Sequence, residues 1–162
     1  SLPEEWKFNY RTKRPPEDPV NAMLSYGYTI LYHHISTALQ IEGLNPQISF
    51  YHSSTNRYFP LASDLQEEFR HIIDVLVLNL IRTNKISFND FLMDSNSNFP
   101  CLMSKTFRKK YIQHVEERLK ILFKPFDSAK QITYKQFITY QVKVLKSAIQ
   151  NKQINYRALK IR

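Results

Sequence analysis

The chain has 162 residues, of which 43% are hydrophobic and only 2 are glycine. This length fits about one domain, and so few glycines argue against a fold of many strands, so we expect a mostly helical domain. The longest apolar run, residues 72–81, is interrupted by Asp74 and Asn79 and is shorter than the roughly 20 residues that cross a bilayer. We therefore expect no membrane segment and, with no signal peptide pattern and one unpaired cysteine, Cys101, a reducing compartment such as the cytoplasm.

The net charge of +9 is unevenly distributed along the chain. Residues 1–14 hold 4 basic and 2 acidic side chains, residues 15–104 hold 4 and 9, and residues 105–162 hold 15 and 3. An acidic middle followed by a strongly basic end suggests a site that holds a cation beside a surface that attracts a polyanion. A basic surface that is merely solvated is the alternative.

Residues 1–18 have no clean periodicity and read as a basic linker that ends in a Pro-Pro turn. Arg11 and Arg14 could touch phosphates there, or they could belong to an ordinary linker. A capping carboxylate at Asp18 and a proline at the next position then predict the start of a helix.

That first helix is expected to run from Pro19 to Glu42, where Gly43 supplies a stop. Its apolar residues recur at helical spacing and should point inward: Val20, Leu24, Tyr28, Leu31, Ile35 and Leu39.

Residues 48–51 could form a short strand or extended segment that ends at His52, and a polar loop follows. A second long helix should begin at Pro60 or Ala62 and end near Asn84. One face of this helix is apolar: Leu61, Leu65, Phe69, Ile72, Leu76 and Leu80. The opposite face is polar: Asp64, Glu67, Glu68 and His71. These acids should face away from the core, where they can converge on something that is not protein.

Ser87 with Asp90 predicts a capping box for a short helix over 88–92, and residues 94–100 should form a loop. A third long helix should run from Ser104 to Phe123, and its inward residues should be Phe107, Tyr111, Val115, Leu119 and Leu122. Thr133 should cap a fourth helix that ends at Gln150. The expected organisation is thus all-α, with a helical domain over 19–150 and a basic tail over 151–162.

The first turns of the third helix carry four cations: Lys105, Arg108, Lys109 and Lys110. Positive charge at a helix N-terminus opposes the helix dipole, and a phosphate partner would offset this conflict, although solvent could also screen it. These four residues are candidates for a DNA track.

Asp64 and Glu67 lie one helical turn apart and can offer oxygen ligands to Mg²⁺ or Mn²⁺, and His52 could add a nitrogen ligand that suits Mn²⁺ better. Such an ion would stabilise charge on a phosphodiester oxygen and activate an attacking hydroxyl. The purely structural interpretation is that carboxylates favour the start of a helix because of its dipole. Cys101 has no histidine near it in the sequence, so a thiol nucleophile is not expected.

Three stretches, RTKRPPEDPVNAMLSYGYTILY at 11–32, GLNPQISFYH at 43–52 and LASDLQEEFR at 61–70, resemble one known domain in order and spacing. It is the catalytic domain of the CRISPR-associated spacer integrase, the first of the numbered Cas proteins. ITYKQFITYQVKVL at 132–145, with Tyr156 and Arg162, resembles the end of that domain. The resemblance implies a helical, metal-dependent DNA endonuclease and integrase that inserts spacers into CRISPR arrays. It also implies a homodimer assembled with a smaller companion Cas protein in a prokaryotic cytoplasm, acting on prespacer and repeat DNA.

The resemblance assigns metal binding to His52 and Glu67 and makes Asp64 the second acid of the same helix. Arg11 and Arg14 belong to the family's R-x-x-R-P-P stretch, to which no task is assigned. The family's other metal-binding glutamate lies in a Glu-Gly motif ahead of the segment that begins here with LPEEW, and no such motif is present. We therefore expect a C-terminal fragment that lacks one ligand and the N-terminal β domain.

Two alternatives to a metal-dependent enzyme remain open at this point. One is a catalytically inactive module that binds DNA and dimerises within the same complex, because the missing glutamate would abolish turnover. The other is a helical interaction domain whose acidic face has no catalytic role.

Overall fold

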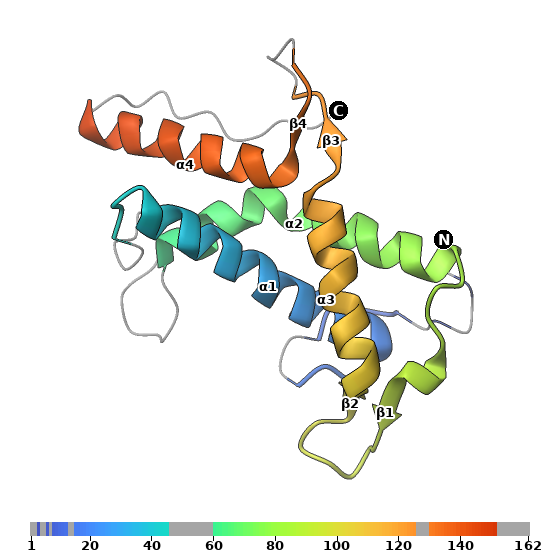
Figure 1. Ribbon diagram of the computed structural model, residues 1–162. Coiled ribbons are helices and arrows are strands. Elements are labelled where there is room, and N and C mark those ends of the chain that lie inside the picture. The colour runs from blue at the N-terminus through green and yellow to red at the C-terminus, as the bar shows by residue number, and fades with distance from the viewer. Residues whose placement is uncertain are drawn as a thin grey trace. The chain divides into compact units, whose positions relative to one another are not determined.

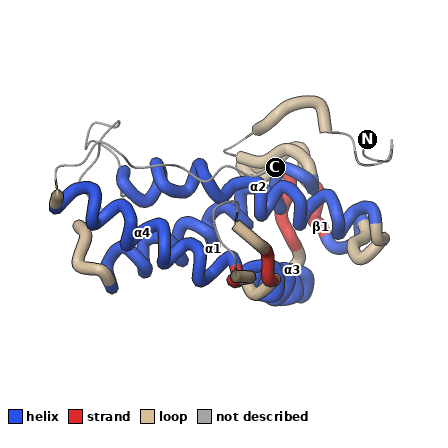
Figure 2. The backbone as a smooth tube through the Cα atoms, turned by 90° about the horizontal axis from the view of Figure 1, so that it is seen from above, coloured by secondary structure: helices blue, strands red, loops and turns tan. Residues whose placement is uncertain are grey.

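The structure of the chain is a computed structural model that describes residue 3, residue 6 and residues 8–12, 15–45, 60–125 and 130–151 (Figure 1). Four long helices dominate these residues: α1 over Pro19–Ile41, α2 over Pro60–Arg82, α3 over Lys105–Leu119 and α4 over Tyr134–Gln150. Strands are few and short, as Figure 2 shows, so the expected all-α class is confirmed. None of the helices in the described residues combines the length and the apolar character needed to cross a bilayer.

The chain divides into two compact units, one made of residues 1–30 and 71–116 and the other of residues 31–70 and 117–162. In the first unit, a 3₁₀ turn over Phe88–Asp90 leads into β1, Phe91–Met93, which pairs antiparallel with β2, Cys101–Met103. In the second unit, β3, Leu122–Phe123, pairs with β4, Ile132–Thr133, directly ahead of α4.

The core of the first unit depends on a close approach at Gly27. A Cβ atom there would lie 2.5 Å from Cγ2 of Ile73 and 2.7 Å from the hydroxyl of Tyr111. Phe107 and Tyr111 from α3 are buried in this unit, and the Phe107 ring also lies 5.3 Å from that of Phe91. A glycine at position 27 is therefore required by packing and not by backbone conformation.

The core of the second unit contains a cluster of aromatic rings. Phe137 of α4 packs edge-on against Phe69 of α2 and Phe123 of β3, with ring centroids 6.1 and 5.4 Å apart. Phe123 in turn stacks on Tyr134 at 4.3 Å. The short β3–β4 pair thus places Phe123 in contact with the aromatic rings of Tyr134 and Phe137 at the start of α4.

The predicted helix ends are confirmed where the sequence carries a cap. Oδ1 of Asp18 accepts from the backbone N–H of Asn21 at 2.8 Å, and Gly43, two residues past the end of α1, has a φ of 72°. Ser87 forms the predicted capping box with Asp90, and Thr133 caps α4 in a box with Gln136. Local side chain to backbone hydrogen bonds therefore fix these boundaries.

The apolar face predicted for α2 is also confirmed, because all six of its apolar residues are buried: Leu61, Leu65, Phe69, Ile72, Leu76 and Leu80. Five of the six residues predicted to point inward from α1 are buried, and Tyr28 is half-buried.

Two predicted helix ends are wrong. The short helix predicted over 88–92 stops at Asp90, because Phe91 and Leu92 pair with β2 instead. The helix predicted to reach Phe123 ends at Leu119, and Leu122 is 57% exposed rather than buried because it belongs to β3. In both places a helical spacing of apolar residues continued into a strand that pairs with the next strand along the chain, 8 to 12 residues away. The strand predicted over 48–51 and most of the tail predicted over 151–162 lie outside the described residues.

Candidate metal and nucleic-acid site

The acidic start of α2 belongs to the second unit. Asp64 is half-buried, whereas Glu67 is exposed, and the two residues lie one helical turn apart. Because the buried apolar residues fix the opposite face of α2, Glu67 is directed towards solvent. Oε1 of Glu67 lies 2.7 Å from Nη2 of Arg70, and Oε2 of Glu68 accepts from Nε2 of Gln141 at 3.4 Å. Two of the acids on this face thus have protein partners.

Asp64 and Glu67 offer the type of ligand atom that a hard divalent cation prefers, but they are fewer than the ligands such an ion takes. Carboxylates such as Asp64 and Glu67 are the ligands that Mg²⁺ and Mn²⁺ take up. No group of three or more His, Cys, Asp or Glu residues suited to a metal occurs in the part of the chain that the structure describes. His52, the predicted nitrogen ligand, lies outside the described residues. A metal bound here would need further ligands besides the two acids.

Arg11, a candidate phosphate ligand in the first unit, has a network of its own. Its guanidinium donates to Oδ1 of Asn21 at 2.8 Å and to the hydroxyl of Ser25 at 2.9 Å, and it also contacts the carbonyl of Thr12. The same group lies 5.6 Å from the ring centroid of Tyr28. Arg11 therefore ties the segment ahead of α1 to that helix, and Arg14 lies outside the described residues.

The cations at the start of α3, also in the first unit, are exposed to solvent: Lys105, Arg108, Lys109 and Lys110. Arg108 differs from the three lysines because its guanidinium lies 5.9 Å from the ring centroid of Tyr26, with Nη2 3.5 Å from the carbonyl of Met103. The ring orients this arginine by a cation–π contact. Helical spacing puts Lys105, Arg108 and Lys109 on one side of α3 and Lys110 on another.

A polar cluster in the first unit was missed by the sequence analysis. The hydroxyl of Tyr28 donates to Oδ1 of Asp74, and the hydroxyl of Tyr111 donates to the carbonyl of Met23 at 2.8 Å. Burial, and then the neighbouring Tyr28 and Asp74, raise the pKa of Tyr111 far above its ordinary value. The signal that could have revealed the cluster is the acid at position 74 within a largely apolar run.

Cys101 is fully buried in β2, and its burial, with a smaller effect from Asp18, raises the pKa of its thiol to about 11. A thiol with so high a pKa holds little of the nucleophilic thiolate at neutral pH. This agrees with the expectation that Cys101 is not a nucleophile.

Comparisons with known proteins, by sequence and by structure, find similarity to the same group of proteins. The family model described as "CRISPR associated protein Cas1" matches residues 1–117. A CRISPR-associated endonuclease Cas1 of Thermus thermophilus is 34% identical over 145 residues, which are 89% of this chain and 43% of that protein. A CRISPR-associated endonuclease Cas1 of Thermodesulfovibrio yellowstonii is 42% identical over 116 residues, which are 72% of this chain and 36% of that protein. The chain therefore spans less than half the length of these curated relatives.

Two solved structures are similar over almost the whole chain. One is a chain of a Cas6-RT-Cas1–Cas2 complex, with a TM-score of 0.85, 31% identity and coverage of 99% of this chain and 17% of that chain. The other is a casposase bound to integration product, with a TM-score of 0.82, 25% identity and coverage of 99% of this chain and 47% of that chain.

Proposed function

The chain belongs to the family of CRISPR-associated Cas1 proteins, and on that premise we propose that it supplies the helical part of a metal-dependent DNA endonuclease and integrase. The reaction we propose is strand transfer that inserts spacers into a CRISPR array. The observation that carries the proposal is the pair Asp64 and Glu67 on one turn of α2, in a chain similar to named Cas1 endonucleases and to a casposase bound to integration product.

In the proposed reaction, a DNA 3′ hydroxyl attacks a phosphorus atom of the target strand. One P–O bond forms as the target's own P–O bond breaks, and the proton lost by the attacking hydroxyl is balanced by one taken up by the leaving oxygen. No protein nucleophile becomes attached to DNA, which agrees with the buried, weakly acidic Cys101.

Asp64 and Glu67 would hold Mn²⁺ or Mg²⁺, with His52 as the nitrogen ligand. When bound, such an ion stabilises negative charge on a phosphodiester oxygen and lowers the pKa of an attacking hydroxyl. Asp64 is half-buried, and a carboxylate in that position is oriented by its surroundings better than an exposed one. We propose that a further carboxylate, equivalent to the family's other metal-binding glutamate, joins these ligands from outside these 162 residues.

DNA is the proposed substrate, and the exposed cations of α3 are the proposed contacts to its phosphates: Lys105, Arg108, Lys109 and Lys110. Arg11 and Arg14 are further candidates. A smaller companion Cas protein is the proposed partner because a similar solved chain comes from a Cas6-RT-Cas1–Cas2 complex. We propose that the chain also forms a homodimer.

The second candidate function is a module that binds DNA and dimerises without catalysis. The ion pair between Glu67 and Arg70 favours this alternative, because a carboxylate that is already paired is a weaker metal ligand.

The experiment that tests the enzyme is a strand-joining assay with Mn²⁺, run on the 162-residue chain and on a longer polypeptide that adds an upstream segment with the family's Glu-Gly motif. We expect little joining by the chain alone and efficient joining by the longer polypeptide. His52→Ala, Asp64→Ala and Glu67→Ala in the longer polypeptide should each abolish joining and leave DNA binding largely intact. Glu17→Ala, at an exposed acid ahead of α1, is the matched control and should join normally.

If the three variants still join strands, the assigned site is wrong. If the longer polypeptide binds DNA and joins none, the non-catalytic module is the better description.

A further inference from the structure

Three lysines lie in a row along one side of α4, in the second unit. Lys135, Lys143 and Lys146 fall within about 80° of one another around the helix axis. The side of α4 that faces the core carries Phe137, Ile138, Val142 and Leu145, all of them buried. The side chains of Lys143 and Lys146 are 61% and 35% exposed, and Lys135 is exposed as well. We call these three lysines the α4 lysine face.

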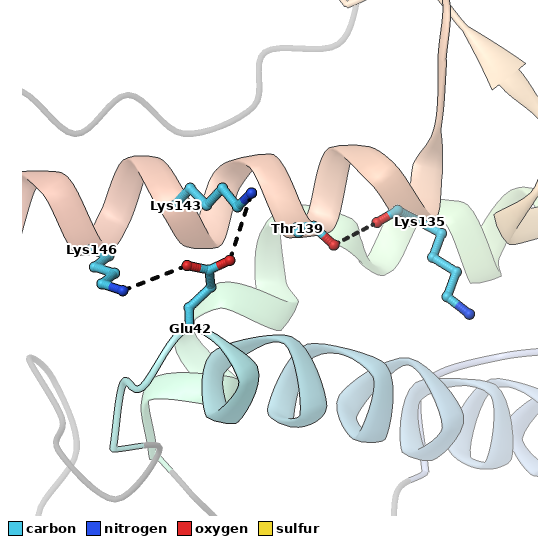
Figure 3. A network of polar contacts seen from close by, with 5 residues as sticks. All are labelled: Glu42, Lys135, Thr139, Lys143 and Lys146. Atoms are coloured by element: carbon cyan, nitrogen blue, oxygen red, sulfur yellow. Dashed lines mark hydrogen bonds and ion pairs between the residues drawn. The ribbon is translucent and has the colours of Figure 1, made fainter.

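Glu42, directly after α1 in the same unit, is the acid that meets this face. Its Oε1 lies 3.8 Å from Nζ of Lys143, and its Oε2 lies 3.6 Å from Nζ of Lys146, as Figure 3 shows. Both separations exceed the 2.7–2.9 Å or so of a charge-assisted hydrogen bond. One carboxylate thus forms two long ion pairs. Because the α4 lysine face has three ammonium groups, it keeps a net positive charge beside the single charge of Glu42.

Thr139 lies between Lys135 and Lys143 on α4 but does not compete for an anion. Its hydroxyl donates back to the carbonyl of Lys135 at 3.3 Å (Figure 3). The nearest polar side chain of the helix is thus satisfied by the backbone, and the ammonium groups are the donors that an incoming anion would meet.

We propose that the α4 lysine face is a second contact surface for the phosphates of DNA, and that Glu42 competes with those phosphates for Lys143 and Lys146. The proposal rests on the proposed function only in taking DNA as the partner. Lys135 and Lys146 are separated by about 16 Å along the helix axis, so the face can follow several phosphates of one duplex. DNA has to displace Glu42 from Lys143 and Lys146 in order to bind there. Glu42 therefore lowers the affinity of the α4 lysine face for a weakly held polyanion.

The simpler interpretation is that Glu42 only ties the end of α1 to α4. The two interpretations predict different effects of Glu42→Gln, which removes the charge and keeps the shape. A tie predicts a lower Tm with unchanged affinity for DNA, whereas a competitor predicts tighter binding of DNA.

The test uses the 162-residue chain and a fluorescein-labelled DNA duplex, with fluorescence anisotropy measured in EDTA at several salt concentrations. Lys143→Gln with Lys146→Gln should weaken binding by about three- to tenfold at low salt and make the log–log salt slope shallower by about 1.8, or 0.9 for each lost phosphate contact. Glu42→Gln should tighten binding by about two- to fivefold, which is the effect expected from removing one weak ion pair.

The matched control is Lys85→Gln with Lys120→Gln, which removes the same charge from two exposed lysines outside the α4 lysine face. Circular dichroism melting confirms that each variant is folded. If the Lys143 and Lys146 variant behaves like this control, or if Glu42→Gln only lowers the Tm, the proposal is overturned. Because EDTA removes metal, a failed joining assay would reject the enzyme without touching this result.

Discussion

Oε1 of Glu67 lies 2.7 Å from Nη2 of Arg70, one turn further along α2. The proposed metal ligand is therefore engaged by a cation of its own helix. A divalent ion that binds Glu67 has to replace this guanidinium, and the positive charge that remains nearby opposes the ion.

Arg70→Gln is accordingly expected to strengthen Mn²⁺ binding by the longer polypeptide, which carries the further carboxylate, by about two- to fivefold if the pair has the strength of an exposed one. Isothermal titration calorimetry measures the Kd, and Arg82→Gln, at an exposed arginine of the same helix, is the control for the loss of positive charge. An unchanged or weaker affinity in Arg70→Gln would argue that Glu67 is not a ligand.

Gly27→Ala should destabilise the protein, because the new methyl group would meet Ile73 and Tyr111 at distances that real Cβ atoms do not show. Overpacking of this kind costs about 1–3 kcal/mol in the free energy of unfolding. Urea denaturation measures the loss. Gly43→Asn is the control, since nothing lies within 4 Å of its Cβ position and asparagine tolerates a positive φ. Equal stabilities for Gly27→Ala and the parent would contradict the close approach.

Tyr111→Phe should cost about 1 kcal/mol at neutral pH, because the hydroxyl hydrogen bond to the carbonyl of Met23 is lost. It should also change the response to alkali. The folded protein holds the pKa of Tyr111 above its ordinary value, so only the unfolded chain releases this proton as the pH passes about 10.

The free energy of unfolding of the parent should therefore fall as the pH rises above about 10, and part of that fall should vanish in Tyr111→Phe. Urea titrations at neutral and alkaline pH measure both effects. Parallel pH profiles for the two proteins would show that Tyr111 does not contribute.

Cys101 should react with a disulfide reagent such as DTNB far more slowly in the folded chain than in urea. Burial raises the pKa of this thiol from 9.0 to about 11, so little thiolate forms below that pH and access is blocked as well. The same shift means that stability is lost as the pH rises from about 9 through 11. Rapid reaction of the folded chain at neutral pH would contradict the burial of Cys101.

The helices could be predicted from the sequence because their signals are local. Asp18, Gly43, Ser87 and Thr133 define helix ends through hydrogen bonds or dihedral angles of a few neighbouring residues, and all four behave as predicted. The two short strand pairs could not be predicted in this way, because Phe91 pairs with Met103 and Leu122 with Thr133. Such pairings depend on contacts between two separate segments, and helical spacing over a few residues does not exclude them.

The candidate site could be predicted only in part from the sequence, for the same reason. Helical spacing was enough to put Asp64 and Glu67 on one face of α2, since that follows from the period of the helix. Spacing did not reveal that Glu68 would accept a hydrogen bond from Gln141, 73 positions away, or that Glu67 would pair with Arg70. Whether His52 joins the two acids stays a prediction.

The side chain of Asn21 accepts from the guanidinium of Arg11 and the backbone N–H of Thr12, and donates to the carbonyl of Tyr10. Upstream of these residues Trp6 is anchored as well, because its ring is buried and stacks on that of Phe88 at 4.5 Å. The reach of a fused domain or a spectroscopic label attached ahead of α1 is therefore measured from Trp6 and not from Pro19. A fully stretched linker reaches about 40 Å less far than it would from Pro19.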